Sequence, residues 1–145
     1  MKIAVGSDHG GYLLKEEIVK HLEKEGYEVL NLGTFSEEAC DYPVFGAAVG
    51  RAIANKEADF GIVVCGSGEG ITMAANKIKG IRAGIGYNDA VSGLLREHNN
   101  ANVIGFGARF MEKEDVLRRV DIFLHTEYAG GRHEKRVNLL SDLEK

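Results

Sequence analysis

The apolar positions of the chain follow two different spacings. In residues 11–25, Leu14, Ile18 and Leu22 recur at every fourth position with charged side chains between them, which predicts a helix with one buried face. Residues 2–6 instead form a short, almost continuous apolar run, which is typical of a strand buried on both faces. The chain therefore contains both helical and strand-forming segments.

Segments of these two kinds alternate along the whole sequence. We predict strands at residues 2–6, 27–32, 60–65, 81–86 and 101–105, and helices at residues 11–25, 43–55, 71–77, 88–97, 112–125 and 131–143. This alternation predicts an α/β fold in which helices cover both faces of a parallel sheet. No repeat, low-complexity segment or linker divides the chain, so we expect residues 1–145 to form a single domain.

Polar and small residues follow three of the predicted strands. Asp8 and His9 come after the first strand, Cys65 ends the third strand before a glycine turn that reaches Gly70, and residues 105–109 follow the fifth strand. In parallel α/β sheets, ligands bind beyond the carboxyl ends of the strands. We therefore expect these three loops to converge at one edge of the sheet.

Cys65 is the first candidate for chemistry, because the next residues are Gly66-Ser67-Gly68-Glu69-Gly70 and then a helical segment. A thiol that faces the amides at a helix start lies in a positive field, which favours the reactive thiolate, and glycines let the backbone approach a ligand. The alternative is a small buried residue that closes a strand, and the residue types leave both interpretations open. Ile71 excludes three other glycine-loop motifs, since the nucleotide-hydrolase, dinucleotide and phosphatase loops require lysine, glycine and arginine in this region.

Two further groups offer polar chemistry. His98 opens an amide-rich segment that could contact a ligand or could simply end a helix, because asparagine tolerates a left-handed conformation. Arg132 and Arg136 are four residues apart on a predicted helix, and they form either a phosphate clamp or a solvated basic face that pairs with acidic residues such as Glu134. His21, on the first helix, is expected to be a solvated surface residue.

Composition and charge exclude several classes of protein. The net charge of −4 offers no general basic surface to nucleic acid or anionic lipid, and no apolar stretch approaches the ~20 residues that cross a bilayer. The first residues lack the layout of a signal peptide, and two cysteines form neither a disulfide framework nor a zinc motif. We therefore expect a cytoplasmic protein.

Several motifs occur in a fixed order along nearly the whole chain: Ser7-Asp8-His9-Gly10-Gly11, Gly33-Thr34, Asp41-Tyr42-Pro43, Cys65 to Gly70 with Ala74-Ala75-Asn76-Lys77, Gly80-Ile81-Arg82-Ala83, His98-Asn99-Asn100-Ala101-Asn102 and Gly130-Gly131-Arg132-His133. This ordered set resembles the sugar-phosphate isomerase family that contains ribose-5-phosphate isomerase B and galactose-6-phosphate isomerase. The resemblance implies a three-layer α/β/α sandwich with a five-stranded parallel, Rossmann-like sheet. It also implies a homodimer with shared active sites, which can pair into a tetramer.

The activity implied by the resemblance is reversible conversion of an aldose phosphate into a ketose phosphate through an enediol, without a metal or organic cofactor. Cys65 matches the base that moves the proton between C1 and C2, and His98 matches the residue that opens the furanose ring. Some family members use a glutamate base instead, but at the position of Ile71, so we expect Glu69 to be a surface or supporting residue.

The resemblance also assigns the residues that bind substrate. Asp8 and His9 match sugar contacts, the loop from Gly66 to Gly70 matches the amides that face the enediolate oxygens, and Asn99 matches a hydroxyl contact. The expected phosphate ligands, all from the neighbouring subunit, are Arg109, Arg132 and Arg136.

Two alternatives remain open at this stage. One keeps the fold and changes the substrate to a six-carbon sugar phosphate, such as allose 6-phosphate or galactose 6-phosphate. The other is a non-catalytic sugar-phosphate sensor. Subunits of the galactose type often work as unlike pairs in which one chain lacks part of the catalytic set, so the joint presence of Cys65, His9 and His98 favours a self-sufficient enzyme. The base and the ring-opening histidine argue against a sensor, because a binding module requires neither.

Overall fold

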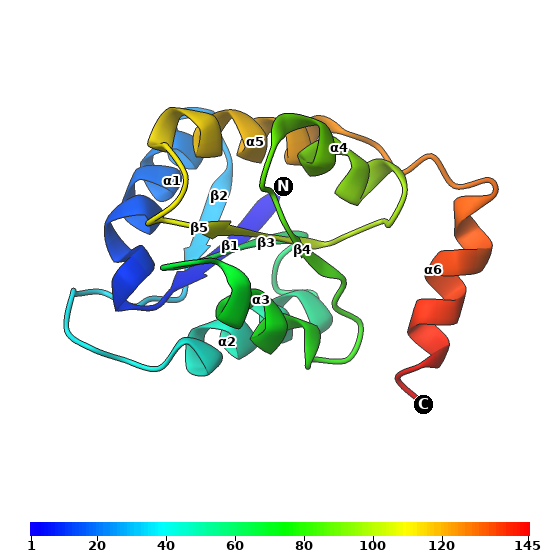
Figure 1. The fold of residues 1–145 in the computed structure, drawn as a ribbon, viewed down its shortest axis with the longest axis horizontal. Coiled ribbons are helices and arrows are strands. Elements are labelled where there is room, and N and C mark those ends of the chain that lie inside the picture. The colour runs from blue at the N-terminus through cyan, green and yellow to red at the C-terminus, as the bar shows by residue number, and fades with distance from the viewer.

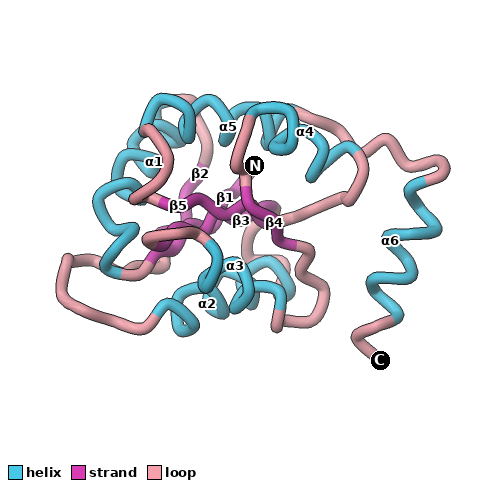
Figure 2. Tube along the Cα trace, viewed as in Figure 1, coloured by secondary structure: helices cyan, strands magenta, loops and turns pink.

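Five parallel strands form one sheet, in the order β2-β1-β3-β5-β4. The computed structural model describes all 145 residues, and Figures 1 and 2 show the sheet between two layers of helices. The strands are β1 (Lys2–Ser7), β2 (Glu28–Asn31), β3 (Phe60–Cys65), β4 (Ala83–Ile85) and β5 (Val103–Gly107). The helices are α1 (Tyr12–Lys24), α2 (Tyr42–Ala54), α3 (Glu69–Asn76), α4 (Asp89–Glu97), α5 (Lys113–His125) and α6 (His133–Asp142), with a short 3₁₀ turn at His9–Gly11.

The sheet is buried on both faces, which explains its continuous apolar strands. Successive side chains of a strand point to opposite faces. Ile62 and Val64 of β3 join the larger apolar core under α1 and α5, whereas Val63 and Cys65 join the smaller core under α2 and α3. The predicted three-layer α/β/α architecture is therefore confirmed.

Among the strands, β5 and β4 differ most from the sequence-based expectation. β5 runs from Val103 to Gly107, two residues later than predicted, so the segment Gly105-Phe106-Gly107 lies inside the strand. The side chain of Thr72 packs on Gly105 and the backbone of Ser67 packs on Gly107, and both contacts need the space that a glycine leaves. β4 is shorter than predicted, as an edge strand that pairs only with β5.

The last helix stands apart from the rest of the molecule. Figure 1 shows α6 beyond the edge strand β4, reached by the segment that follows α5. Only Val137 is buried among its residues, whereas Leu139 and Leu140 are 54% and 46% exposed. No helix of the protein combines the length and apolar character that a membrane crossing requires.

Phe123 anchors α5 to the sheet, and its removal tests the larger core. Its ring is fully buried and meets the ring of Phe60 edge to face, with centroids 5.8 Å apart. Phe123→Ala should lower the free energy of unfolding by about 3–5 kcal/mol, because it leaves a cavity that the sheet cannot close. Phe110→Ala removes a ring that is 78% exposed and should change stability by less than about 0.5 kcal/mol in the same denaturant titration.

Candidate active site

Three loops converge at the carboxyl edge of the sheet, as the sequence predicted. Asp8 follows β1 and its carboxylate accepts a hydrogen bond from the backbone N–H of Gly11 at 3.1 Å, which holds the 3₁₀ turn that carries His9. Cys65 ends β3 opposite Gly107 of β5, so the loops after these two strands are neighbours. The shared edge follows from the common direction of all five strands.

The Cys65 thiol lies inside the glycine turn and is 5% exposed. The backbone N–H of Gly68 donates a hydrogen bond to Sγ at 3.1 Å. Gly68 has φ +85°, and a Cβ there would lie 2.7 Å from the backbone of Phe106, so only glycine fits this turn. The sulfur is therefore held inside the turn, with a backbone amide as its hydrogen-bond donor.

One ring nitrogen of His9 is fixed by a backbone contact. Its Nδ1 accepts a hydrogen bond from the backbone N–H of Cys40 at 3.2 Å, so a neutral ring carries its proton on Nε2 and can donate to a ligand. His9 and Arg109 both line an open cleft of about 1050 Å³ at this edge. No pattern in the sequence indicates this contact of Cys40, because the segment before α2 is a polar loop without regular periodicity.

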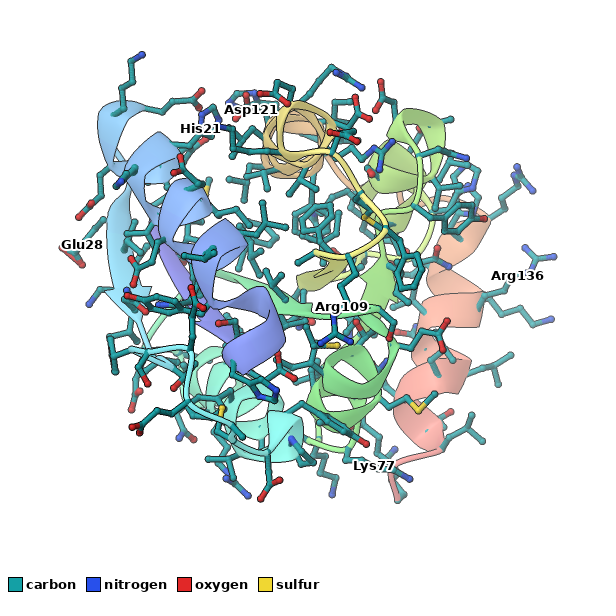
Figure 3. The ribbon with its side chains drawn as sticks, turned by 60° about the vertical axis from the view of Figure 1, so that its left-hand side comes forward. His21, Glu28, Lys77, Arg109, Asp121 and Arg136 are labelled. Atoms are coloured by element: carbon teal, nitrogen blue, oxygen red, sulfur yellow. The ribbon has the colours of Figure 1, made fainter.

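Arg109 lies at the same edge and on the same chain as Cys65. Its backbone N–H donates to the carbonyl of Gly66 at 3.0 Å, and its guanidinium packs on Gly66, where a Cβ would lie 3.3 Å from the guanidinium carbon. This position favours a phosphate contact of Arg109 within the same subunit as Cys65 over the expected contact from the neighbouring subunit. The reason is the end of β5, which places the turn containing Arg109 directly beside β3 (Figure 3).

Glu69 and Tyr42 complete the surroundings of the glycine turn. Glu69 is exposed at the start of α3, which agrees with the expected surface position, and its N–H donates to the hydroxyl of Ser67 at 3.2 Å. The ring of Tyr42 lies against Gly70, where a Cβ would come within 2.8 Å of the ring. The motif around Tyr42 was part of the recognised set, but nothing in the sequence showed that its ring would reach the turn.

A second group of candidate residues lies at the opposite, amino edge of the sheet. α4 joins the end of β4 to the start of the parallel strand β5, so it must return across the sheet, and its C-cap is His98. Asn99 follows His98 and is exposed. Since β5 has five residues at ~3.3 Å each, the two edges are separated by roughly 15 Å. One chain therefore does not bring His98 and Asn99 next to Cys65.

The start of α6 joins this second group. The imidazole of His133 stacks on that of His98, with centroids 4.2 Å apart and planes inclined by 17°. Arg132 caps α6 and Arg136 follows one turn later, and neither forms an ion pair with Glu134 or any other carboxylate. Figure 3 shows Arg136 on α6, at a distance from Arg109.

Basic side chains predominate among the charged neighbours of His133 at the amino edge. Burial lowers the pKa of His133, nearby His98, Arg132 and Arg136 lower it further, and Glu97 acts in the opposite direction. Free guanidinium groups beside a cationic field are suited to binding a phosphate. Arg132 and Arg136 are thus not neutralised by acidic residues of their own chain, and ligand binding by this cluster stays a prediction.

His21 departs from its expected position as a solvated residue. Its Nε2 lies 2.9 Å from a carboxylate oxygen of Asp121 and 3.2 Å from one of Glu25, because α1 and α5 pack side by side (Figure 3). The imidazole nitrogen and the two carboxylate oxygens lie within 4.8 Å of one another, which is close enough for all three to bind one metal ion. They satisfy one another and lie on the helical layer, outside both groups of site residues.

The whole chain matches one known family. A sequence model described as Ribose/Galactose Isomerase matches residues 3–140. The chain belongs to the ribose/galactose isomerase family. The sequence resemblance is confirmed, and the family match spans both groups of site residues.

Relatives within the ribose/galactose isomerase family are similar over their full length. Ribose-5-phosphate isomerase B of Escherichia coli is 45% identical, with 99% of this chain and 97% of the relative aligned. The structure of Clostridium thermocellum ribose-5-phosphate isomerase B superposes with a TM-score of 0.98 at 48% identity, covering 99% and 97% of the two chains. Ribose-5-phosphate isomerase B of Mycoplasma genitalium, solved with bound ribulose-5-phosphate, gives a TM-score of 0.94 at 36% identity and covers 99% and 95%.

The contact between Gly68 and Cys65 can be tested through the reactivity of the thiol. Gly68→Ala should displace the amide and lower the rate of Cys65 alkylation at neutral pH by about threefold or more, relative to the rate at alkaline pH where the thiol is ionised. Gly80→Ala is the matched control, because Gly80 also has a positive φ but a Cβ there meets no atom within 4 Å. Site-resolved mass spectrometry measures the rate, and equal effects of both substitutions would contradict a role for the Gly68 amide.

Proposed function

We propose that the protein is an aldose–ketose isomerase that interconverts ribose 5-phosphate and ribulose 5-phosphate through an enediol. The observation that carries this proposal is the position of the Cys65 thiol. It accepts a hydrogen bond from the backbone N–H of Gly68 inside the glycine turn, at the carboxyl edge of the sheet. The relative from Mycoplasma genitalium binds ribulose-5-phosphate and shares this fold along nearly its whole length. Phosphorylated sugars are too polar to cross membranes freely, so the proposed place of action is the cytoplasm.

Proton transfer is the central step of the proposed reaction. The Cys65 thiolate removes the proton from C2 of the open aldose, and the electron pair moves into a C1–C2 double bond as charge develops on the aldehyde oxygen. Within the turn from Gly66 to Gly70, the Gly68 and Glu69 amides donate to Cys65 and Ser67, so the remaining amides, those of Gly66, Ser67 and Gly70, would stabilise this charge. The thiol then returns the proton to C1, while the hydroxyl proton of O2 is lost to form the ketone and O1 is protonated. Both steps use the same sulfur, so no cofactor is required.

Ring opening must precede this transfer when the substrate is a furanose. His98 is proposed to take the proton of the O1 hydroxyl and to supply a proton to the ring oxygen, which breaks the C1–O4 bond and yields the aldehyde. Asn99 contacts a sugar hydroxyl in this proposal. Asp8 and His9 hold the remaining hydroxyls from the Cys65 side.

The proposed active site requires two subunits, because Cys65 and His98 lie at opposite edges of one sheet. In a homodimer, His98, Asn99, Arg132 and Arg136 of the partner subunit would face Cys65 and complete the site. The exposed leucines of α6 and the separation of this helix from its own domain support such an arrangement. Arg109 would bind phosphate from the Cys65 side, so the two subunits share the anion. A tetramer would be a pair of such dimers.

Substrate length is the part of the proposal that an assay decides directly. Purified protein should convert ribose 5-phosphate with a kcat/KM well above that for allose 6-phosphate or galactose 6-phosphate. A preference for a six-carbon substrate would replace the proposed substrate and keep the reaction. Binding of all three without turnover would instead support the sensor alternative.

Cys65→Ala tests the base. The substitution should lower the turnover of ribose 5-phosphate by about 10²–10⁴-fold, which is the usual contribution of a positioned base, and change substrate affinity only slightly. Uptake of deuterium at C1 of ribulose 5-phosphate in D₂O should fall equally, because that exchange reports enediol formation alone. Substantial residual exchange would exclude Cys65 as the base and make Glu69 the next candidate.

Subunit mixing tests the shared site. Arg136→Ala should raise KM about tenfold or more, since a charge-assisted phosphate contact contributes about 1.5–3 kcal/mol. Mixing Cys65→Ala subunits with Arg136→Ala subunits should restore activity at low substrate, because each heterodimer has one site with both defects and one intact site.

Arg109→Ala provides the matched control for this mixing experiment. Cys65 and Arg109 lie on the same edge of one chain, so heterodimers of these two variants contain one defect in each site and should show no recovery. Recovery in both mixtures, or in neither after verified subunit exchange, would contradict the proposed dimer.

A further inference from the structure

The turn that follows His98 is held in an unusual conformation. Asn100 has φ +48°, the left-handed region that is uncommon for residues other than glycine, and it ends α4. Its N–H donates to the carbonyl of Arg96 at 3.2 Å, and the N–H of Ala101 donates to that of Leu95 at 2.8 Å. These bonds fix the direction in which the chain leaves the helix, and therefore the place of His98.

The side chain of Arg96 binds this turn from inside the protein. One guanidinium nitrogen donates to the side-chain oxygen of Asn100 at 3.0 Å and to the carbonyl of Ala101 at 2.6 Å. The guanidinium lies over the ring of Phe60, 4.6 Å from its centroid, while its Nε is buried without a partner. Arg96 thus ties the turn to β3 in the core of the sheet.

A second arginine holds the other side of Asn100. The Nε of Arg82 donates to the carbonyl of Asn100 at 2.9 Å. Neither Arg82 nor Arg96 forms an ion pair with a carboxylate. Burial lowers the pKa of the Arg96 guanidinium, and the charge of Arg82 lowers it further. Both effects disfavour the charged form of Arg96. Two neighbouring arginines without carboxylate partners are unfavourable for stability. Their local effect is to hold the turn at Asn100 in place.

We propose that Arg96 is a positioning residue for ring opening, which acts through Asn100 to hold the helix end that presents His98 and Asn99. This role rests on the function proposed for His98. The segment after α5 is tied to the same helix end, because the N–H of Ala129 donates to the carbonyl of Glu97 at 3.0 Å. Loss of the Arg96 contacts would therefore disturb the stacking of His98 on His133 as well.

Arg96→Met tests this role, because methionine keeps apolar contact with Phe60 and removes both hydrogen bonds. Turnover of ribose 5-phosphate should fall about tenfold or more, since a misplaced group can lose up to about 10²-fold in rate. Deuterium uptake at C1 of ribulose 5-phosphate should stay within about threefold, because an open-chain ketose needs no ring opening. His98→Asn should give the same pattern. Equal losses in turnover and exchange would overturn the proposal.

Asn100→Gly separates the positioning path from a general loss of stability. Glycine keeps the left-handed turn and removes only the side-chain acceptor, so the variant should reproduce the Arg96→Met pattern more weakly. Combining both substitutions should give less than the product of their separate effects, because Arg96 acts partly through this acceptor. If the double variant loses turnover by the full product of the two single-variant effects, the two residues act independently and the path through Asn100 is contradicted.

Two further measurements complete the test. Arg118→Met is the matched control, because Arg118 also makes several hydrogen bonds, to Asp89 and Asp115, but lies away from the turn. It should leave the ratio of turnover to exchange unchanged. The imidazole NMR signals of His98 and His133 should shift together in Arg96→Met and not in Arg118→Met. If wild-type protein lacks isomerase activity, the proposed function fails, and unshifted imidazole signals in Arg96→Met would separately overturn the positioning role.

Discussion

All five strands of the sheet run in the same direction, and this constraint decides where every candidate residue lies. Each loop after a strand reaches the carboxyl edge, and each helix must return across the sheet before the next strand begins. Cys65 and Arg109 follow strands and therefore share one edge. His98 follows a helix and lies at the other. The need for a partner subunit in the proposed reaction is a direct consequence of this topology.

Close backbone packing makes the carboxyl edge suitable for proton transfer. Gly68 turns the chain so that its amide reaches the sulfur of Cys65, and Gly107 allows the turn to pack directly on β5. Amides fixed in this way need no rearrangement when charge develops on a substrate oxygen. The same glycines that relax the local backbone therefore make the site rigid once the sheet is formed.

The amino edge is organised by positive charges without carboxylate partners. Arg132 and Arg136 are free to bind an anion, while Arg82 and Arg96 are engaged by backbone and amide oxygens of the turn at Asn100. Neutralising these cations inside the chain would improve stability and would remove the field that attracts a phosphate. The cost in stability and the proposed function thus have the same physical origin.

The sequence by itself determined the alternation of strands and helices, the parallel sheet and the convergence of Asp8, His9 and Cys65, because periodic burial and glycine turns are local properties. The ordered motifs also determined the family. Tertiary structure alone decided the end of β5, the contact of Arg109 with Gly66, the hydrogen bond from Cys40 to His9 and the pairing of His21 with Asp121. Each of these joins segments that are distant in the chain, so it depends on how helices pack across the sheet. No pattern of neighbouring residues encodes such packing, and for that reason the sequence could name candidate residues without showing that they lie at two edges of the sheet.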